Sequence, residues 1–207
     1  MEPMKARIAV LVSGGGTNLQ ALLDAEQSGK LASGTIALVV SNKKDAYALT
    51  RASEHGVKAV TLTKREAGSH EEFERQLVEL LEKESIDLII LAGFLAILSE
   101  SFTKRFPRRI INVHPSLIPA FCGKGFYGLK VHEEALKRGV KVTGATVHFV
   151  NEIPDGGEII FQKAVSVLPG DTPEILQRRV MEEAEWILLP MAAEQVSSEI
   201  LNSRRAQ

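Results

Sequence analysis

The sequence predicts an α/β protein built on a Rossmann-like, mostly parallel twisted sheet, with helices on both faces and an antiparallel C-terminal hairpin. Two observations indicate this fold class. Short apolar runs of strand length alternate with helical patterns through the first half of the chain, as they do around a parallel sheet. In the second half, two strand patterns are joined by a short loop that contains Asp-Gly-Gly, as in a hairpin. The 207 residues, 44% of them hydrophobic, fit a single domain over residues 1–207.

Composition and charge exclude several classes of protein. The formal net charge of −1 argues against a general binder of nucleic acid or membrane surfaces, which would present a basic field. Cys122 is the single cysteine, so the chain offers neither an internal disulfide nor a thiolate metal cluster. The N-terminus has no signal-peptide core, and no apolar stretch is long enough to span a bilayer. We therefore expect a cytoplasmic protein.

The strands and helices of the first half follow one another in order. Residues 7–12 form a continuous apolar run, which is typical of a strand that is buried on both faces. Further strands are expected at residues 35–40, 57–62 and 87–92. Helical patterns lie at residues 19–27, 46–54 and 70–83. The polar residues 64–69 are expected to form a loop.

A glycine loop, SGGGTN at residues 13–18, connects the first strand to the first helix. Converging backbone N–H groups and the positive end of the helix make such a connection suitable for a phosphate. Leu19 stands where a dinucleotide motif has its last glycine, and no Lys-Ser/Thr pair follows as in a nucleoside-triphosphate loop. A phosphomonoester ligand therefore fits the loop better than either of these. The alternative is a glycine turn that serves only the close packing of strand and helix.

The stretch IINVHPSLIP at residues 110–119 offers the clearest candidate for catalysis. Its first two residues end a buried strand, which Pro115 cannot continue. Asn112 and His114 point to the same side at the carboxyl end of that strand, where open α/β sheets bind ligands. Asn112 could donate a hydrogen bond to an oxyanion, and His114 could carry a proton near neutral pH. Alternatively, Asn112 caps a turn and His114 bonds to the backbone.

Two other loops in the chain have more than one interpretation. Residues 94–98, FLAIL, follow the fourth strand and either join the core or form the lip of an apolar pocket for a flat ring. Residues 121–128, FCGKGFYG, form a glycine-rich loop of a kind that is often functional. Cys122 in this loop has no visible activating partner, and we expect it to be unreactive.

The remaining chain is expected to form a helix, a hairpin and a final helix. The first helix covers residues 129–138, the hairpin strands cover residues 141–150 and 158–167, and the final helix covers residues 172–198 with an interruption at Pro190. Asp155, between the hairpin strands, either supplies turn chemistry or reaches an imidazole, whose charged form it would favour. His148 is either a satisfied core residue or a helper in the site. His132 either faces the site or packs in the core.

Five segments together resemble one known family. In chain order they are SGGGTNLQ, LAGFLAIL, INVHPSLIP, TGATVHFV and IPDGGEII. With this spacing, from Arg7 to about Glu194, the chain resembles the phosphoribosylglycinamide formyltransferases, also called glycinamide ribonucleotide transformylases, of the formyltransferase superfamily. The Asn-x-His-Pro-Ser-Leu-x-Pro motif is shared by formyltetrahydrofolate-type hydrolases and transferases, so it marks the superfamily. The glycine loop that ends in Thr17-Asn18 narrows the resemblance to the ribonucleotide enzymes.

The resemblance implies a formyltransferase fold and a reaction. The formyl group of 10-formyltetrahydrofolate, a co-substrate, would pass to the amine of 5′-phosphoribosylglycinamide in de novo purine biosynthesis. A phosphate-binding half would cover about residues 7–105, and a catalytic, folate-binding half about residues 106–200. The resemblance implies no metal, small-molecule ligands rather than nucleic acid or membrane, and a monomer or a homodimer.

The resemblance also assigns roles to individual residues. The catalytic residues would be Asn112, His114 and Asp155, with Asp155 raising the pKa of His114 so that Asn112 and a protonated His114 stabilise the tetrahedral intermediate. The phosphoribosyl group would be held by Gly15, Gly16, Thr17, Asn18 and Glu185. The folate would meet His70, Leu95, Ala96, Ile97, Leu98, Asn112 and Asn151.

Three residues depart from the family pattern. His70 and Ala96 stand where arginine is common, and Trp186 stands where histidine is common. These departures affect contacts at the edge of the ligand site rather than its catalytic positions. Two other functions stay open: a sister enzyme that formylates another amine or hydrolyses formyltetrahydrofolate, and a non-enzymatic sensor of a phosphate ligand.

Overall fold

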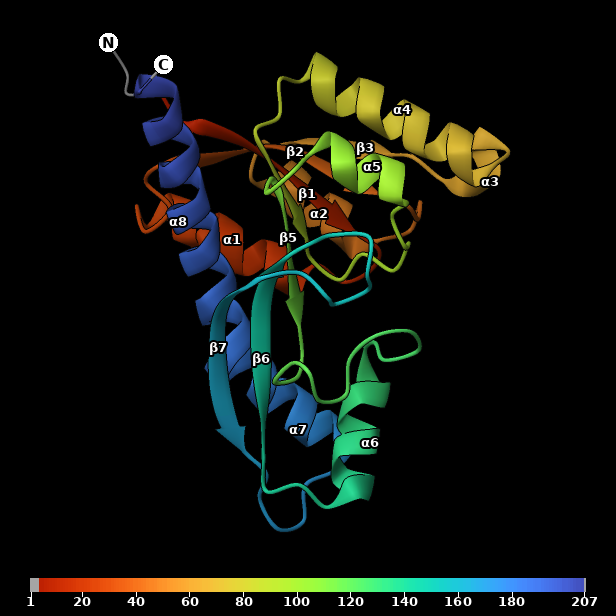
Figure 1. Ribbon diagram of the computed structural model, residues 1–207, viewed down its shortest axis with the longest axis vertical. Helices are drawn as coiled ribbons and strands as arrows, with labels where there is room; N and C mark the ends of the chain where they lie inside the picture. The colour runs from red at the N-terminus through yellow and green to blue at the C-terminus, as the bar shows by residue number, and fades with distance from the viewer. Residues whose placement is uncertain (1–3, 207) are drawn as a thin grey trace.

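The structure is a computed structural model that describes residues 4–206. Its centre is a seven-stranded sheet with the strand order β3-β2-β1-β4-β5-β6-β7 (Figure 1). The first five strands in this order pair in parallel, and β6 and β7 each run antiparallel to the preceding neighbour. Because helices pack on both faces of this sheet, the predicted fold class is confirmed.

The strands and most helices agree with the predicted ranges, but the helix at Glu100–Arg105 was not predicted and the last helix extends beyond the predicted end at residue 198. The strands are β1 Ala6–Val12, β2 Gly34–Ser41, β3 Lys58–Thr61, β4 Leu88–Leu91, β5 Ile110–His114, β6 Val142–Phe149 and β7 Ile159–Ser166. The helices are α1 Thr17–Gln27, α2 Tyr47–Glu54, α3 Lys64–Ala67, α4 His70–Lys83, α5 Glu100–Arg105, α6 Leu129–Arg138, α7 Pro173–Val180 and α8 Trp186–Arg205, with a π-helical turn, η1, at Met181–Glu185.

The polar segment before α4 is not a plain loop as predicted, because it contains the single-turn helix α3. Thr63 caps this helix by accepting a hydrogen bond from the backbone N–H of Glu66, and Gly68 ends it with a φ of 88°. Ser69 then caps α4 in the same way through the N–H of Glu72. The two caps explain why polar residues are helical here.

The final helix is interrupted at a different place from the one predicted. Pro190 lies inside α8, and the irregular turn is the π turn that ends at Glu185. A proline crowds the carbonyl four residues before it, here that of Trp186. The wider π turn lies directly before that residue, so we attribute the accommodation of Pro190 to it. The π turn also brings Glu185 to the cavity described below.

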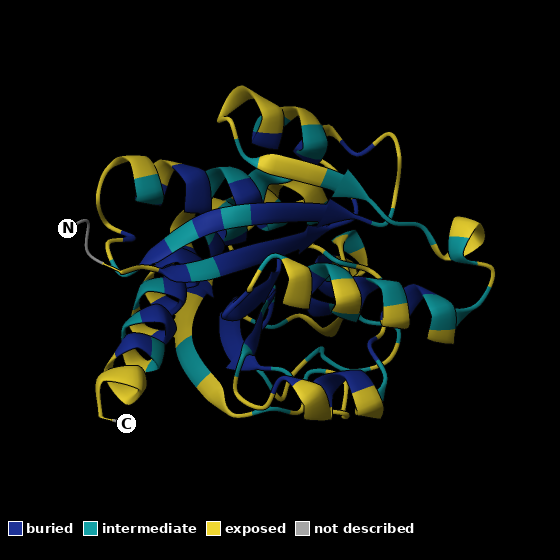
Figure 2. Cartoon of the chain, turned by 90° about the horizontal axis from the view of Figure 1, so that it is seen from above, coloured by how far each residue is buried: buried dark blue, intermediate teal, exposed yellow. Residues whose placement is uncertain are grey.

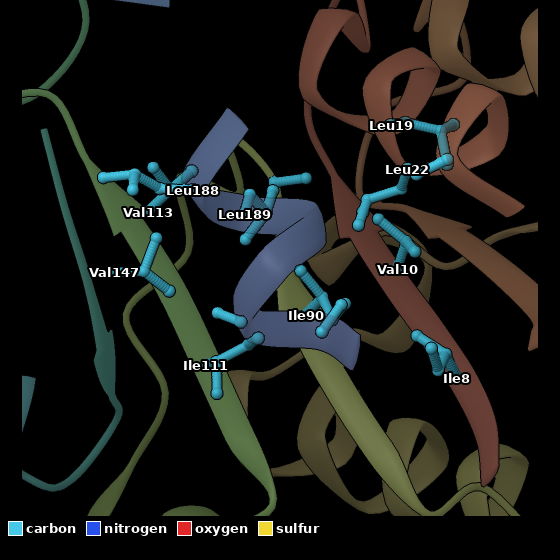
Figure 3. Close-up of a cluster of buried hydrophobic side chains, with 14 of the residues drawn as sticks. Ile8, Val10, Leu19, Leu22, Ile90, Ile111, Val113, Val147, Leu188 and Leu189 are labelled. Atoms are coloured by element: carbon cyan, nitrogen blue, oxygen red, sulfur yellow. The ribbon is translucent and has the colours of Figure 1, made fainter. Parts of the chain in front are cut away.

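Two hydrophobic clusters sandwich the sheet. Successive residues of β1 alternate between them, with Ile8 and Val10 in the first cluster and Ala9 and Leu11 in the second. Helices α1, α2, α7 and α8 contribute to the first cluster, and α4 and α5 to the second. Figure 3 shows α8 lying over the strands in the first cluster. Figure 2 shows that the central strands are buried while the helices expose their outer sides.

This topology brings several loops to one edge of the sheet. Strands β1, β4 and β5 are parallel neighbours, so the loops that leave their carboxyl ends lie side by side. These loops begin at Ser13, Ala92 and Pro115. Among residues 4–206, no helix is long and apolar enough to cross a membrane.

The pairing of β6 with β7 depends on the absence of a side chain at Gly144. A Cβ atom there would lie 2.0 Å from the carbonyl oxygen of Lys163 on β7, a backbone atom that cannot move alone. We expect Gly144→Ala to lower the free energy of unfolding by about 2 kcal/mol or more, measured by urea denaturation. Val142→Ala, at a half-exposed position of β6, is the control and should change it by about 0.5 kcal/mol or less. Equal effects of the two substitutions would contradict this account.

Candidate active site

A cavity of about 780 Å³ lies along the carboxyl edge of the sheet. Its walls come from the loops after β1, β4 and β5, from the loop before α6, and from the turn between β6 and β7. The lining residues are Gly14–Asn18, Ala92–Ile97, Asn112–Pro115, Gly123–Gly128, Pro154, Asp155, Gln177, Met181 and Glu185. The candidate residues from distant parts of the sequence thus meet in one space of the size of small-molecule sites.

The glycine loop serves packing and leaves donors free at the cavity. Gly16 has a φ of 72°, and a Cβ atom there would lie 2.6 Å from the Cβ of Ala48 on α2. Close packing therefore requires glycine at this position. Gly16 is also the N-cap of α1 and provides no side-chain cap, so the first backbone N–H groups of the helix remain available to an anion. Gly16 therefore serves close packing, while phosphate binding by the loop stays a prediction.

Asn18 and Glu185 form a buried pair on the wall of the cavity. Asn18 Nδ2 donates a hydrogen bond of 2.8 Å to Glu185 Oε2. Burial raises the pKa of Glu185 to about 7, although the bond from Asn18 opposes this shift. The Asn18 Oδ1 atom is buried and has no hydrogen-bond partner among the described residues. The pair therefore offers both an acceptor and, in part of the molecules near neutral pH, a carboxylic acid donor.

Asn112, His114 and Asp155 come together at the carboxyl end of β5. His114 Nδ1 lies 3.5 Å from Asp155 Oδ2, and both side chains are largely buried. Asp155 is held in place because Oδ2 also accepts a hydrogen bond of 2.8 Å from the N–H of Gly123. The loop before α6 and the turn after β6 are thus tied to each other beside the His114 ring.

The pKa of His114 depends on two opposing effects. Burial lowers the pKa of His114 below its ordinary value, and this outweighs Asp155 and the Phe121 carbonyl, which both raise the pKa. Asp155 thus raises the pKa of His114, as expected, although burial lowers it by more, and a protonated His114 during the reaction stays a prediction. His114 Nε2 lies 2.8 Å from the Phe121 carbonyl oxygen, so this nitrogen carries a proton and its N–H donates a hydrogen bond to the carbonyl.

Asp155 is ionised in this setting. Burial raises its pKa, but the His148 and His114 rings in their protonated forms and the Gly123 N–H together outweigh burial and hold the pKa of Asp155 below its usual value. A stable carboxylate beside a neutral imidazole means that His114 can take up a proton once a reaction supplies one.

Two histidines left open by the sequence lie near the site. His148 is buried, and its Nε2 atom is 3.2 Å from Asn112 Nδ2 and 3.6 Å from Asp155 Oδ1. His132 on α6 is fully buried, and neither ring nitrogen has a hydrogen-bond partner among the described residues. Burial and, to a lesser degree, His114 lower the pKa of His132 to about 4, so this ring is neutral near pH 7. Strand register places His148 beside Asn112, and helix packing buries His132. The local sequence around each histidine did not indicate these placements.

Three residues predicted to contact folate lie outside the cavity lining. His70 faces Glu74 on α4, Leu98 is buried in the second hydrophobic cluster, and Asn151 accepts a hydrogen bond from the Ile153 N–H. The residues just before Leu98 do line the cavity. Leu95 and Ile97 are more than half exposed at its lip, and Ala96 lies between them. The apolar segment after β4 is thus divided between pocket lip and core.

The loop at residues 121–128 contributes more to the cavity than the sequence indicated. Lys124, Phe126 and Tyr127 line it. Cys122 donates to the Pro119 carbonyl, and burial followed by the charge of Asp155 raises the pKa of the Cys122 thiol. This agrees with an unreactive cysteine. Within residues 4–206, no group of three or more His, Cys, Asp or Glu side chains is arranged to hold a metal ion.

Comparisons with known proteins agree on one family. The family model described as Formyl transferase matches residues 6–192. A chloroplastic phosphoribosylglycinamide formyltransferase of Arabidopsis thaliana is 40% identical over 183 residues, covering 88% of this chain and 62% of the relative. The trifunctional purine biosynthetic protein adenosine-3 of Gallus gallus is 44% identical over 194 residues, covering 94% of this chain and 19% of the relative. The chain therefore spans less than two thirds of the length of either relative.

A solved structure is similar over nearly the whole chain. The crystal structure of glycinamide ribonucleotide transformylase 1 from Symbiobacterium toebii superimposes with a TM-score of 0.88 at 43% identity. The match covers 94% of this chain and 89% of that one.

The raised pKa of Glu185 makes stability depend on pH. Between about pH 4.5 and 7 the folded protein keeps a proton on Glu185 that the unfolded chain releases, so the free energy of unfolding falls as pH rises. We expect Glu185→Gln to remove about 3 kcal/mol of this fall between pH 5 and pH 8, measured by urea denaturation. Glu183→Gln, an exposed neighbour, should leave the fall unchanged. A wild-type pH profile that Glu185→Gln does not alter would contradict the shift.

Proposed function

The chain belongs to the formyl transferase family, and we propose that it transfers the formyl group of 10-formyltetrahydrofolate to the amine of 5′-phosphoribosylglycinamide in purine biosynthesis. The observation that carries this proposal is one cavity with two chemically different regions. One region has the free N–H groups of the glycine loop and α1, and the other has Asn112, His114 and Asp155. The names of the relatives support the same reaction.

The proposed binding mode follows from the cavity walls. The phosphate would lie against residues 15–18, and Glu185 would meet the sugar hydroxyls, for which a carboxyl group that is partly protonated can both accept and donate. The flat ring of the folate would lie against residues 95–97 and Asn112. His70, Leu98 and Asn151 do not line the cavity, and their contacts with the folate stay predictions of the sequence. On this basis we propose one domain, with phosphate binding in residues 7–105 and catalysis in residues 106–200.

The proposed chemistry is acyl transfer without a covalent enzyme intermediate. The substrate amine attacks the formyl carbon, and negative charge develops on the formyl oxygen. The Asn112 amide donates to this oxygen, a contact of a kind worth about 3 kcal/mol in the barrier. The attacking nitrogen then loses a proton, the folate N10 gains one, and the bond between N10 and the formyl carbon breaks.

His114 is the proposed proton carrier, directly or through a water molecule. In the unliganded site its Nε2–H donates to the Phe121 carbonyl. During the reaction this N–H would turn to the formyl oxygen instead. The negative charge on that oxygen and on Asp155 would raise the pKa of His114 and offset the effect of burial. Because Nε2 already carries a proton, the proton of the amine would be taken up at Nδ1 through a water molecule and returned from there to N10.

A second function is a formyltetrahydrofolate hydrolase or a formyltransferase for another amine. The shared Asn-x-His-Pro motif favours it, because that motif occurs throughout the superfamily. Anion donors at the glycine loop favour a phosphorylated acceptor instead. Placement in the cytoplasm and a monomeric or homodimeric state stay predictions of the sequence. No metal is needed for the proposed reaction.

The proposal predicts which substitutions stop turnover. With phosphoribosylglycinamide and 10-formyltetrahydrofolate, Asn112→Ala, His114→Ala and Asp155→Asn should each lower kcat about 100-fold or more while the circular dichroism spectrum is kept. His55→Ala, on an exposed residue outside the cavity, is the control and should retain activity. Near wild-type turnover in two of the three variants would contradict the proposed mechanism. Release of formate without formylated amine would instead favour the hydrolase.

A further inference from the structure

The proposed role of Asn112 requires its amide to face one particular way. A terminal amide has an oxygen that only accepts hydrogen bonds and a nitrogen that only donates them. If the group turned over, the cavity would meet an acceptor where the developing oxyanion needs a donor. The surrounding hydrogen bonds decide which way the amide faces, and the nearest partner is His148.

The tautomer of His148 is determined by the backbone. Its Nδ1 atom lies 2.8 Å from the carbonyl oxygen of Phe149, the next residue on β6. A carbonyl oxygen can only accept, so Nδ1 must carry the proton. In the neutral ring Nε2 is then a bare acceptor. His148 is 1% exposed, so water does not compete for this position.

Strand register places that acceptor against Asn112. Asn112 on β5 and His148 on β6 are direct cross-strand partners. Nε2 lies 3.2 Å from Asn112 Nδ2, within the range of a hydrogen bond. The turned-over amide would set its oxygen against the lone pair of Nε2, two acceptors with no proton between them. The ring therefore selects the orientation in which the amide nitrogen faces it.

Asp155 is a second polar neighbour of His148 Nε2. Its Oδ1 atom is 3.6 Å from the same Nε2 atom, too long for a normal hydrogen bond. Asn112 Nδ2 is closer to Nε2, so in the neutral ring the lone pair of His148 serves Asn112. One of the two hydrogens on Asn112 Nδ2 is used by His148, which leaves the other for the cavity that Asn112 lines.

We propose that His148 is a positioning residue, whose Nδ1–H tautomer is set by the Phe149 carbonyl and whose Nε2 atom holds the Asn112 amide with an N–H toward the cavity. The proposal deepens the formyl transfer proposed above and rests on it. His148 acts through Asn112 and touches no substrate itself.

A double-mutant cycle tests whether the effect passes through Asn112. His148→Phe keeps a buried ring but removes the acceptor, and we expect kcat to fall about 10- to 100-fold with both KM values within about twofold. In the Asn112→Ala background the same substitution should change kcat less than about twofold. Equal losses of kcat in both backgrounds would overturn the proposal, because a merely structural role predicts that result.

Two further variants control for damage to the strand. Thr143→Val changes another buried polar residue of β6, away from Asn112 in the register, and should keep wild-type kcat. His148→Gln restores a side-chain acceptor and should recover part of the lost kcat. Activity of His148→Gln as low as that of His148→Phe would count against the proposal.

Nitrogen NMR of the histidine rings tests the geometry without relying on turnover. At pH 8, above the ordinary imidazole range, the His148 signals should show a protonated Nδ1 and an unprotonated Nε2, and they are assigned by their loss in His148→Phe. The opposite tautomer would overturn the proposal even in a fully active enzyme. A wild-type protein that forms no formylated amine would count against the proposed function, while the observed tautomer would still decide the placement of Asn112.

Discussion

The antiparallel pairing of β5 with β6 is the contact on which the catalytic end of the cavity depends. It sets Asn112 opposite His148 and leaves His114 at the last paired position of β5. The turn after β6 then brings Asp155 to both imidazoles and to the loop before α6. Side chains from three separate segments are therefore arranged by one stretch of backbone hydrogen bonds. A shift of one residue in this register would turn Asn112 and His114 to the opposite face.

Burial, rather than pairing of charges alone, determines the protonation of the site. It lowers the pKa of His114 and raises the pKa of Glu185, in each case against hydrogen bonds or charges that act in the opposite direction. Asp155 shows the reverse balance. His148, His114 and the Gly123 N–H lower its pKa by more than burial raises it. The cavity thus contains an ionised carboxylate, a carboxyl group near its titration point and a neutral imidazole. This set suits a reaction that moves a proton between two nitrogens.

The two ends of the cavity use glycine and backbone in different ways. At the phosphate end, Gly16 is required by its positive φ and by the approach of α2, and the same geometry leaves the helix N–H groups uncapped. At the catalytic end, the backbone carbonyls of Phe121 and Phe149 each accept a hydrogen bond from a histidine ring N–H and so determine which ring nitrogen is bare. At both ends, backbone groups determine which hydrogen-bond donors and acceptors face the cavity.

Local sequence determined much of this molecule. The pattern at residues 70–83 predicted α4 with its observed bounds, and the apolar run before Pro115 predicted a strand end that presents Asn112 and His114 together. These predictions depended only on neighbours along the chain, such as caps, periodicity and the missing N–H of proline. The link between Asp155 and His114 came from resemblance to a family, since turn chemistry alone explained an aspartate before two glycines. Tertiary structure decided the neutral state of His114, the placement of Leu98 in the core and the partnership of His148 with Asn112. Each of these depends on burial or on cross-strand register, which involve residues far apart in the sequence and leave no periodic signal in it.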